Sequence, residues 1–205
     1  MFTTEYGVAS LTLREIPYRQ EAYISILSSC QPKELLEECV GFCRACGAEK
    51  IYAQNHEYLE RYPVHTTVVK MQGIACVDES KVENLWPVTE ETVARWRGFM
   101  NERLKDVDGA ETLDRQSEME ILTSGAYFVH RDGQMLGAGW LKYGKLLLVA
   151  ANPGMGERVM HTLMSLQPDE PMELEVAVTN IPAVRLYQKL GFAATEELHK
   201  WYKVF

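Results

Sequence analysis

Two glycines stand between an apolar segment and an amphipathic one, where a chain can bind an anion. The segment Leu146 to Ala150 is continuously apolar, and Gly154 and Gly156 come shortly after it, ahead of residues with helical periodicity. Glycines let a backbone approach a ligand closely, and the first amides of a helix attract a phosphate group. The same pattern is also typical of an ordinary strand-to-helix connection, so both interpretations stay open.

The cysteines and histidines give less support to a chemical role. Cys43-x-x-Cys46, together with Cys39, could bind a metal or act in redox chemistry, but no second pair completes a four-ligand set. Because the three recur at i, i+4 and i+7 on the apolar face of one expected helix, we expect them to pack in the core. No ligand spacing links the five histidines, and His130 and His161 are expected to be exposed.

The elements that must position the glycines alternate regularly along the second half of the chain. Asp132-Gly133 is a strong turn signal and predicts a hairpin over 126–130 and 135–142. The apolar run predicts a strand over 145–150 that is buried on both faces. A helix over 154–166, a strand over 173–178, a helix over 182–190 and a last strand region over 192–205 complete the series. Such a series indicates an α/β or α+β mixed sheet with helices on its faces.

The first half contains similar elements. The patterns predict a hairpin over 8–13 and 22–27 around Pro17, a helix over 32–46, strands over 50–54 and 64–71, a helix after Thr89 and a less regular helix over 111–122. Thr89 is the expected N-cap, and Val93, Trp96, Met100 and Leu104 form the expected apolar face. The order hairpin, strand, helix, strand occurs in both halves, either by chance or through an ancient duplication.

Composition excludes several classes of protein. The chain has 205 residues, 46% hydrophobic and 24% charged, and 21 Lys and Arg against 29 Asp and Glu give a net charge of -8. A nucleic-acid partner is not expected, because such proteins usually carry a basic face. No apolar run is long enough to span a bilayer, and five cysteines fit reduced thiols, so we expect a cytoplasmic protein with no membrane partner.

Residues downstream of the glycines complete a known pattern. The segment Asn180-x-x-Ala183-x-x-Leu186-Tyr187-x-Lys189-x-Gly191-Phe192 resembles the signature of the GNAT superfamily of acyl-CoA-dependent N-acyltransferases. The strand, Gly154-x-Gly156 and the helix before it resemble that family's coenzyme A motif. The resemblance implies a GNAT-like fold, with an acetyltransferase domain at 76–205 and a partial, degenerate GNAT-like segment at 1–75.

The resemblance also implies acetyl-CoA as the cosubstrate, without a metal. In the family, two strands that correspond to 145–150 and 173–178 splay apart, and the pantetheine arm lies in the gap against strand backbone. The pyrophosphate lies on the amides of the loop and the helix start, where Arg158 could add a charge-assisted contact. The implied binding residues are Leu148, Val149, Ala150, Asn152, Gly154, Met155, Gly156, Glu157, Arg158, Asn180, Ala183 and Tyr187.

Tyr187 and an acid are the implied catalytic residues. Tyr187 is similar to the tyrosine that, in many members, protonates the departing thiolate; without the motif it would be read as a core aromatic. Direct attack on a thioester needs a neutral amine, so a base must accept a proton. Many relatives use Glu on the strand before the loop, but 145–150 contains no acid. Glu175 is the first candidate, and Glu173, Glu118 and Glu120 are the alternatives.

One departure from the family pattern concerns the cation of the phosphate loop. The family usually has Arg or Gln three residues before the first glycine, where this chain has Ala151.

The resemblance as a whole implies transfer of an acetyl group from acetyl-CoA to a primary amine of a small molecule or peptide. The alternative is an inactive CoA-binding or protein-interaction module. Residues 1–75 could also serve a homodimer.

Overall fold

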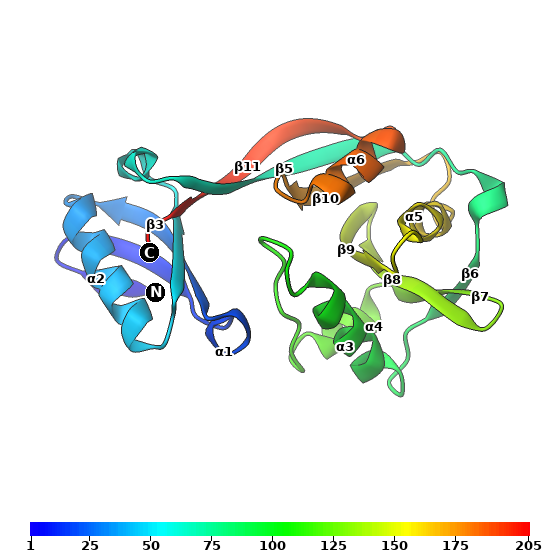
Figure 1. Cartoon of the computed structure of the whole chain (residues 1–205), viewed down its shortest axis with the longest axis horizontal. Helices are drawn as coiled ribbons and strands as arrows, with labels where there is room; N and C mark the ends of the chain where they lie inside the picture. The colour runs from blue at the N-terminus through cyan, green and yellow to red at the C-terminus, as the bar shows by residue number, and fades with distance from the viewer. The chain divides into compact units, whose positions relative to one another are not determined.

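The computed structural model describes residues 1 to 205 and divides them into two compact units (Figure 1). Unit 1 comprises Met1–Val68 and Glu197–Phe205, and unit 2 comprises Val69–Glu196. The predicted division at residues 75 and 76 does not coincide with these units. The C-terminal residues belong to unit 1 because Tyr202 and Lys203 pair with a strand of that unit, opposite Ala53 and Tyr52.

Unit 1 confirms the predicted hairpin, helix and strand. Its strands are β1 (Phe2–Thr4), β2 (Gly7–Thr12), β3 (Glu21–Ser29) and β4 (Lys50–Gln54). β2 is antiparallel to β3, and a short helix α1 (Ile16–Arg19) lies at the turn marked by Pro17. Helix α2 (Pro32–Ala45) connects β3 to β4, which are parallel. Together these elements form a β-α-β unit with α2 packed against the sheet.

The cysteines of α2 belong to the core of unit 1, with one exception. Cys39 and Cys43 are fully buried among apolar side chains, and burial raises the pKa of the two thiols to about 12 and about 11. Cys46 is exposed, because α2 ends at Ala45 and Cys46 is only its C-cap. The prediction of core packing is therefore correct for two of the three, and none of the five cysteines is in a disulfide.

Unit 2 contains the elements that follow the acidic stretch. Its strands are β6 (Asn84–Pro87), β7 (Ala126–Arg131), β8 (Gln134–Lys142), β9 (Lys145–Ala151) and β10 (Pro171–Ala177). Its helices are α3 (Val93–Leu104), α4 (Glu118–Thr123), α5 (Gly156–Met164) and α6 (Ile181–Lys189), besides the short 3₁₀ helix η2 (Glu79–Lys81). The strands from β6 to β9 are successive antiparallel neighbours, and β10 is parallel to β9.

The sheet of unit 2 has helices on both faces, as predicted. Helices α5 and α6 pack on one face, over a core that includes Leu163 and Leu174. Helices α3 and α4 pack on the other, where Trp96 and Ile121 are buried. Helix α5 lies close to β8, since a Cβ on Gly139 would lie only 2.3 Å from a side-chain atom of Leu163.

Two strands, β5 (Val64–Ile74) and β11 (Ala193–Lys203), each begin in one unit and end in the other. In unit 1 the strand order is β2-β3-β4-β11, and in unit 2 it is β8-β9-β10-β5. A 3₁₀ helix η1 (Glu57–Arg61) follows β4 as α6 follows β10. The two units thus share one order of elements. In unit 1 the strand beside β4 is β11, which comes from the end of the chain, and in unit 2 the strand beside β10 is β5, which comes from the first half of the chain.

Three expectations from the sequence need correction. Helix α3 begins at Val93 with Thr92, not Thr89, as the N-cap, because the Thr89 carbonyl accepts from the Val93 amide in the preceding turn. Most of the helix predicted over 111–122 is a loop; the Asp114 carboxylate accepts from the amides of residues 116 and 117 and holds a turn there, so that only α4 forms.

The third correction concerns burial. His130 and His161 are both buried, not exposed. Strand β9 is not fully buried on both faces either, since only Leu146 and Ala150 among its residues are buried. No helix of the structure is long and apolar enough to cross a membrane.

Candidate functional site

Strands β9 and β10 part soon after they begin. They pair only at Lys145 with Glu173 and at Leu146 with Leu174, although β9 continues to Ala151 and β10 to Ala177. β9 remains paired with β8 as far as Ala151. The edge of β9 from 147 to 151, which includes Leu148, Val149 and Ala150, therefore has backbone N–H and C=O groups without a partner strand.

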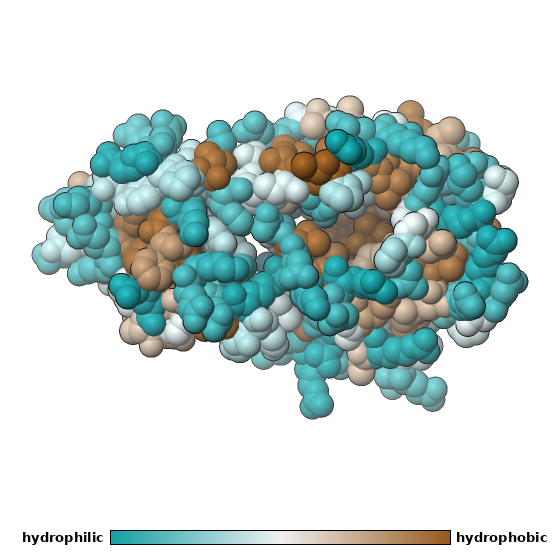
Figure 2. All heavy atoms as spheres, in the orientation of Figure 1, coloured by the Kyte–Doolittle hydropathy of each residue, from teal (hydrophilic) through white to brown (hydrophobic).

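Space opens at this edge in the surface of unit 2. Figure 2 shows a hollow there, with hydrophobic atoms at its floor, between the strands that Figure 1 labels β9 and β10. Because both the backbone groups and an apolar floor are available, the gap suits an extended ligand with amides and methylene groups.

The loop after β9 forms a tight turn. The Met155 amide donates to the Asn152 carbonyl at 2.9 Å, and Gly154 has a φ of 80°, which together with Pro153 at the second position is typical of a type II turn. The Asn152 amide donates to the Leu136 carbonyl at 2.8 Å. Of the predicted phosphate-binding amides, those of Asn152 and Met155 are thus already used, and Pro153 has none.

The start of α5 retains open amides. Its N-cap, Met155, makes no side-chain capping bond, so the amides of Gly156, Glu157 and Arg158 have no partner within the helix. A Cβ on Gly156 would lie 3.1 Å from the Leu186 side chain, so the glycine lets this end of α5 lie close to α6. The helix start therefore presents unpaired amides of the kind that bind anions.

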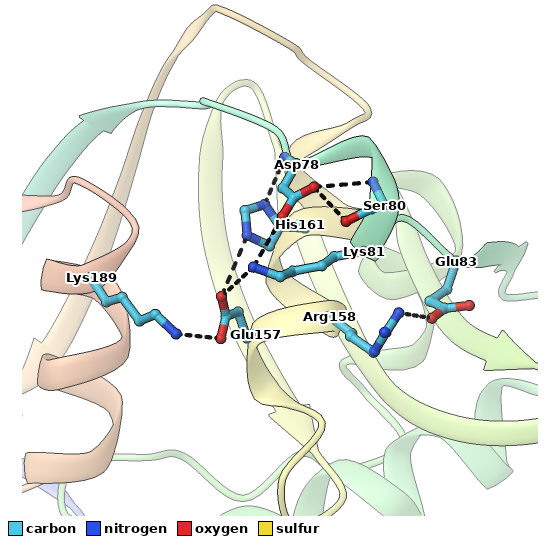
Figure 3. A network of polar contacts seen from close by, with 8 residues as sticks. All are labelled: Asp78, Ser80, Lys81, Glu83, Glu157, Arg158, His161 and Lys189. Carbon is cyan, nitrogen blue, oxygen red and sulfur yellow. Dashed lines mark hydrogen bonds and ion pairs between the residues drawn. The ribbon is translucent and has the colours of Figure 1, made fainter.

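A group of ionised side chains surrounds the first turn of α5 (Figure 3). The Glu157 carboxylate lies between two lysines, at 2.7 Å from Lys81 Nζ and 2.6 Å from Lys189 Nζ. The hydrogen bonds from Lys189 and then Lys81 lower the pKa of Glu157 to about 2. Its side chain therefore holds these two cations beside the amides and is not itself available to a ligand.

His161, one turn further along α5 than Glu157, belongs to the same group. Its Nδ1 accepts from the Asp78 amide at 3.2 Å, and burial lowers the pKa of the imidazole. His161 is therefore neutral at neutral pH and ties the segment before η2 to α5.

Arg158 points away from Glu157 in Figure 3, toward Glu83. Its Nη1 lies 2.6 Å from Glu83 Oε1, and Arg131 lies 3.8 Å from the same oxygen. For Arg158 to contact a phosphate, as the sequence predicts, this ion pair would have to break. The amide of Arg158, in contrast, is part of the open helix start.

Tyr187 lies in the core between α6 and the sheet. Its side chain is buried and its ring centroid is 6.2 Å from that of Phe192. Burial raises the pKa of the phenol to about 12, so the hydroxyl stays protonated at neutral pH. The hydroxyl makes no hydrogen bond within the chain, and its proton is available to a ligand.

The carboxylates predicted as bases all have partners. Glu175 lies 2.5 Å from Lys145 Nζ, and the Glu173 side chain accepts from Gln72. The two alternatives on α4 pair with cations, Glu118 with Arg97 and Glu120 with Lys142.

Glu175 and Tyr187 lie on opposite sides of the sheet. Glu175 is on the face of β10 opposite Leu174 and Val176, which pack with Tyr187 in one core. The two predicted catalytic residues would therefore act from different sides of a ligand in the gap.

Asn180 and Ala183 form the cap of α6. The Asn180 side chain accepts from the Ala183 amide at 3.3 Å and so begins the helix that carries Tyr187. The Asn180 side chain is thus used in positioning α6, and its Oδ1 has one lone pair occupied by this bond.

Sequence reasoning missed two contacts, one from the last turn of α3 and one from the residues just after it. Arg103 Nη2 donates to Asn152 Oδ1 at 2.5 Å, and the Thr179 hydroxyl donates to Asp108 at 2.8 Å. Asn152 follows β9 and Thr179 follows β10, so one short segment contacts both strands where they have parted. No spacing in the sequence signals these contacts, because each joins residues that lie more than 45 positions apart.

Comparisons with known proteins identify the fold. No family model matches the chain, and neither does any curated protein. A functionally unknown conserved protein from Staphylococcus epidermidis aligns over 98% of this chain and 91% of its own, with a TM-score of 0.60 at 9% identity. A GCN5-related N-acetyltransferase from Sphaerobacter thermophilus aligns over 95% and 75%, with a TM-score of 0.54 at 10% identity.

A third structure, an acetyltransferase of the GNAT family from Colwellia psychrerythraea, aligns over 87% of this chain and 77% of its own, with a TM-score of 0.52 at 13% identity. These likenesses confirm the predicted fold class, a mixed α/β fold like that of the GNAT acetyltransferases. Because all identities are low, they are evidence of fold and not of substrate.

Proposed function

We propose that this protein is a cytoplasmic acyltransferase that moves an acetyl group from acetyl-CoA to a primary amine of a small molecule or peptide. The observation that carries the proposal is the early parting of β9 from β10, directly beside the open amides of α5. The gap suits a pantetheine arm and the amides suit a pyrophosphate, so one extended ligand would use both features.

The chain's own residues would contribute mainly by positioning. Acetyl-CoA supplies the activated acyl group when it is bound. The unpaired edge of β9 at Leu148, Val149 and Ala150 would hold the arm, and amides near the gap would polarise the thioester carbonyl. Much of the rate would come from holding the amine and the thioester together.

Tyr187 would protonate the leaving group. The amine nitrogen attacks the thioester carbonyl, a C–N bond forms, the C–S bond breaks, and the thiolate takes a proton. A hydroxyl whose pKa is about 12 is protonated at neutral pH and has no partner within the chain, so it can donate that proton.

Glu175 is our candidate for the base that takes a proton from the ammonium form of the acceptor, so that the neutral amine can attack the thioester. Lys145 holds its carboxylate at 2.5 Å, on the side of the sheet opposite Tyr187. Glu175→Gln should lower kcat with little change in coenzyme affinity, whereas Glu173→Gln should change neither. A kcat of Glu175→Gln equal to that of the wild type would leave Glu175 without a catalytic role.

A second candidate function is binding of CoA without turnover. It is favoured by the partners that occupy the proposed base and Arg158, and by Ala151 in the phosphate loop. Such a module would bind the coenzyme through the same gap.

Calorimetry and a thiol-release assay separate the two. For an acyltransferase, we expect acetyl-CoA to bind, and polyamines, amino acids or aminoglycosides to accelerate release of the free thiol. Binding without any acceptor-dependent release supports the module. The absence of heat with both acetyl-CoA and CoA would contradict both proposals.

A further inference from the structure

The loop between β9 and α5 lacks a cation of its own, but a cation reaches it from another element. Residue 151, where the family pattern usually has Arg or Gln, is Ala. The next residue, Asn152, receives the guanidinium of Arg103 from the last turn of α3, at 2.5 Å from Nη2 to Oδ1. Arg103 thus stands at the first residue of the loop whose glycines and open amides make up the anion site.

Asn152 is rigidly held in the position that receives Arg103. Its amide donates to the Leu136 carbonyl at 2.8 Å, and its side-chain Nδ2 donates to the Met135 carbonyl at 2.6 Å. These two bonds fix the side-chain amide so that Oδ1 faces Arg103. The Cζ of the Arg103 guanidinium lies 5.7 Å from the ring centroid of Phe99. Arg103 is therefore oriented by an acceptor and an aromatic ring.

Arg103 differs from the other cations near α5 in its partners. Lys81 and Lys189 pair with Glu157, and Arg158 pairs with Glu83. Arg103 makes its polar contact with a neutral amide and forms no ion pair with a carboxylate. Its positive charge is thus not neutralised within the chain. One hydrogen bond to Asn152 leaves most of its five N–H donors for another ligand.

We propose that Arg103 binds the pyrophosphate of the coenzyme in place of the missing cation at position 151, with Asn152 as its positioning residue. This inference rests on the proposed function. A planar guanidinium matches two phosphate oxygens at once, which a single helix amide does not. Binding the coenzyme would thereby connect α3 to the loop after β9.

Calorimetric titrations of the full-length chain with CoA, dephospho-CoA and pantetheine test the proposal. Arg103→Ala should weaken binding of CoA and of dephospho-CoA about tenfold each, because both carry the pyrophosphate. Pantetheine, which lacks it, should bind Arg103→Ala and the wild type equally. The loss for CoA should shrink as salt is added, since screening weakens an exposed charge contact. Arg103→Lys should recover part of the affinity.

Arg95→Ala is the matched control. Arg95 is an exposed arginine of the same helix that also lies over a phenylalanine ring, 5.6 Å from the centroid of Phe128, but it does not contact the loop. The Arg95→Ala variant should bind CoA with the affinity of the wild type.

Three results would overturn the inference. Unchanged CoA affinity of Arg103→Ala, with a wild type that binds CoA, removes Arg103 from the site and leaves the proposed function intact. A loss seen with CoA but not with dephospho-CoA assigns Arg103 to the 3′-phosphate instead. A wild type that binds none of the three ligands contradicts the proposed function and the inference with it.

Discussion

The segments β3–α2–β4 of unit 1 and β9–α5–β10 of unit 2 have the same topology, yet they differ at the points where a coenzyme would bind. β3 and β4 pair along all five residues of β4, from Lys50 to Gln54, whereas β9 and β10 pair at only two positions. The Gln54 side chain also donates to Ser25, a residue of β3, at 2.8 Å. The same arrangement of elements therefore holds a closed pair of strands in one unit and a parted pair in the other.

The connections from β3 to α2 and from β9 to α5 also differ, and again only unit 2 has the feature that a coenzyme would use. In unit 1 only two residues lead from β3 to α2, and Pro32 at the first helical position has no amide to offer. In unit 2 a four-residue turn leads to α5, whose first position is Gly156. The comparison teaches that the same topology can hold paired strands or parted ones; the proposed coenzyme site depends on parted strands together with open helix amides.

The strongest test of the comparison concerns Tyr187, in the helix that follows β10, and Tyr62, at the end of the 3₁₀ helix that follows β4. Tyr187→Phe should lower kcat about 100-fold and leave acetyl-CoA affinity within about twofold, because only the proton donor is lost. Tyr62→Phe, in the comparable segment of unit 1, should leave both unchanged. Steady-state kinetics and calorimetry on the two variants measure this difference. Equal kcat for Tyr187→Phe and the wild type would remove the general acid from the mechanism.

An exchange at the first helical position should have the next largest effect. Gly156→Pro removes one open amide and should weaken CoA binding about tenfold. Pro32→Gly adds an amide to α2 but should create no second site, because β3 and β4 remain paired. Calorimetry should give one CoA per chain for the wild type and for Pro32→Gly; a stoichiometry of two would contradict the comparison.

Much of this comparison is visible in the sequence. The apolar run before Gly154, the turn at Asp132-Gly133 and the helix opened by Pro32 were all predictable from local patterns, because each depends on neighbouring residues. The polar contacts of the site were not predictable. Lys81 meets Glu157 across 76 positions and Arg103 meets Asn152 across 49. Such pairs depend on how the elements pack, which periodicity does not specify.

The ionised group at α5 has no counterpart in the segment between β3 and α2 and should make unit 2 sensitive to acid. The pKa of Glu157 is about 2 in the folded chain, below its ordinary value of 4.5, so its contribution to stability is complete above about pH 4.5 and is lost as the pH falls toward 2. Glu157→Gln should lower Tm by about 2 °C at pH 7, with a difference that disappears near pH 2.

Thermal unfolding from pH 7 to pH 2 measures that difference. Glu102→Gln, which breaks an exposed pair with Lys105, is the control and should shift Tm less. A Tm difference for Glu157→Gln that grew toward pH 2 would contradict the assignment.

The smallest expected effect concerns the side-chain bond between β3 and β4. Ser25→Ala should lower the free energy of unfolding by about 1 kcal/mol, because Gln54 loses its hydrogen-bond partner. Affinity for CoA should not change. Denaturant titration and calorimetry test both statements, and a second CoA bound by Ser25→Ala would show that this bond alone keeps unit 1 closed.

The exchange of β5 and β11 has a consequence for any attempt to dissect the chain. A fragment that starts at residue 76 would lack β5, the neighbour of β10, and a fragment that stops at residue 75 would lack β11, the neighbour of β4. Each piece would expose an unsatisfied strand edge prone to aggregation. Either fragment alone is therefore expected to aggregate, whereas the full-length chain carries both β5 and β11.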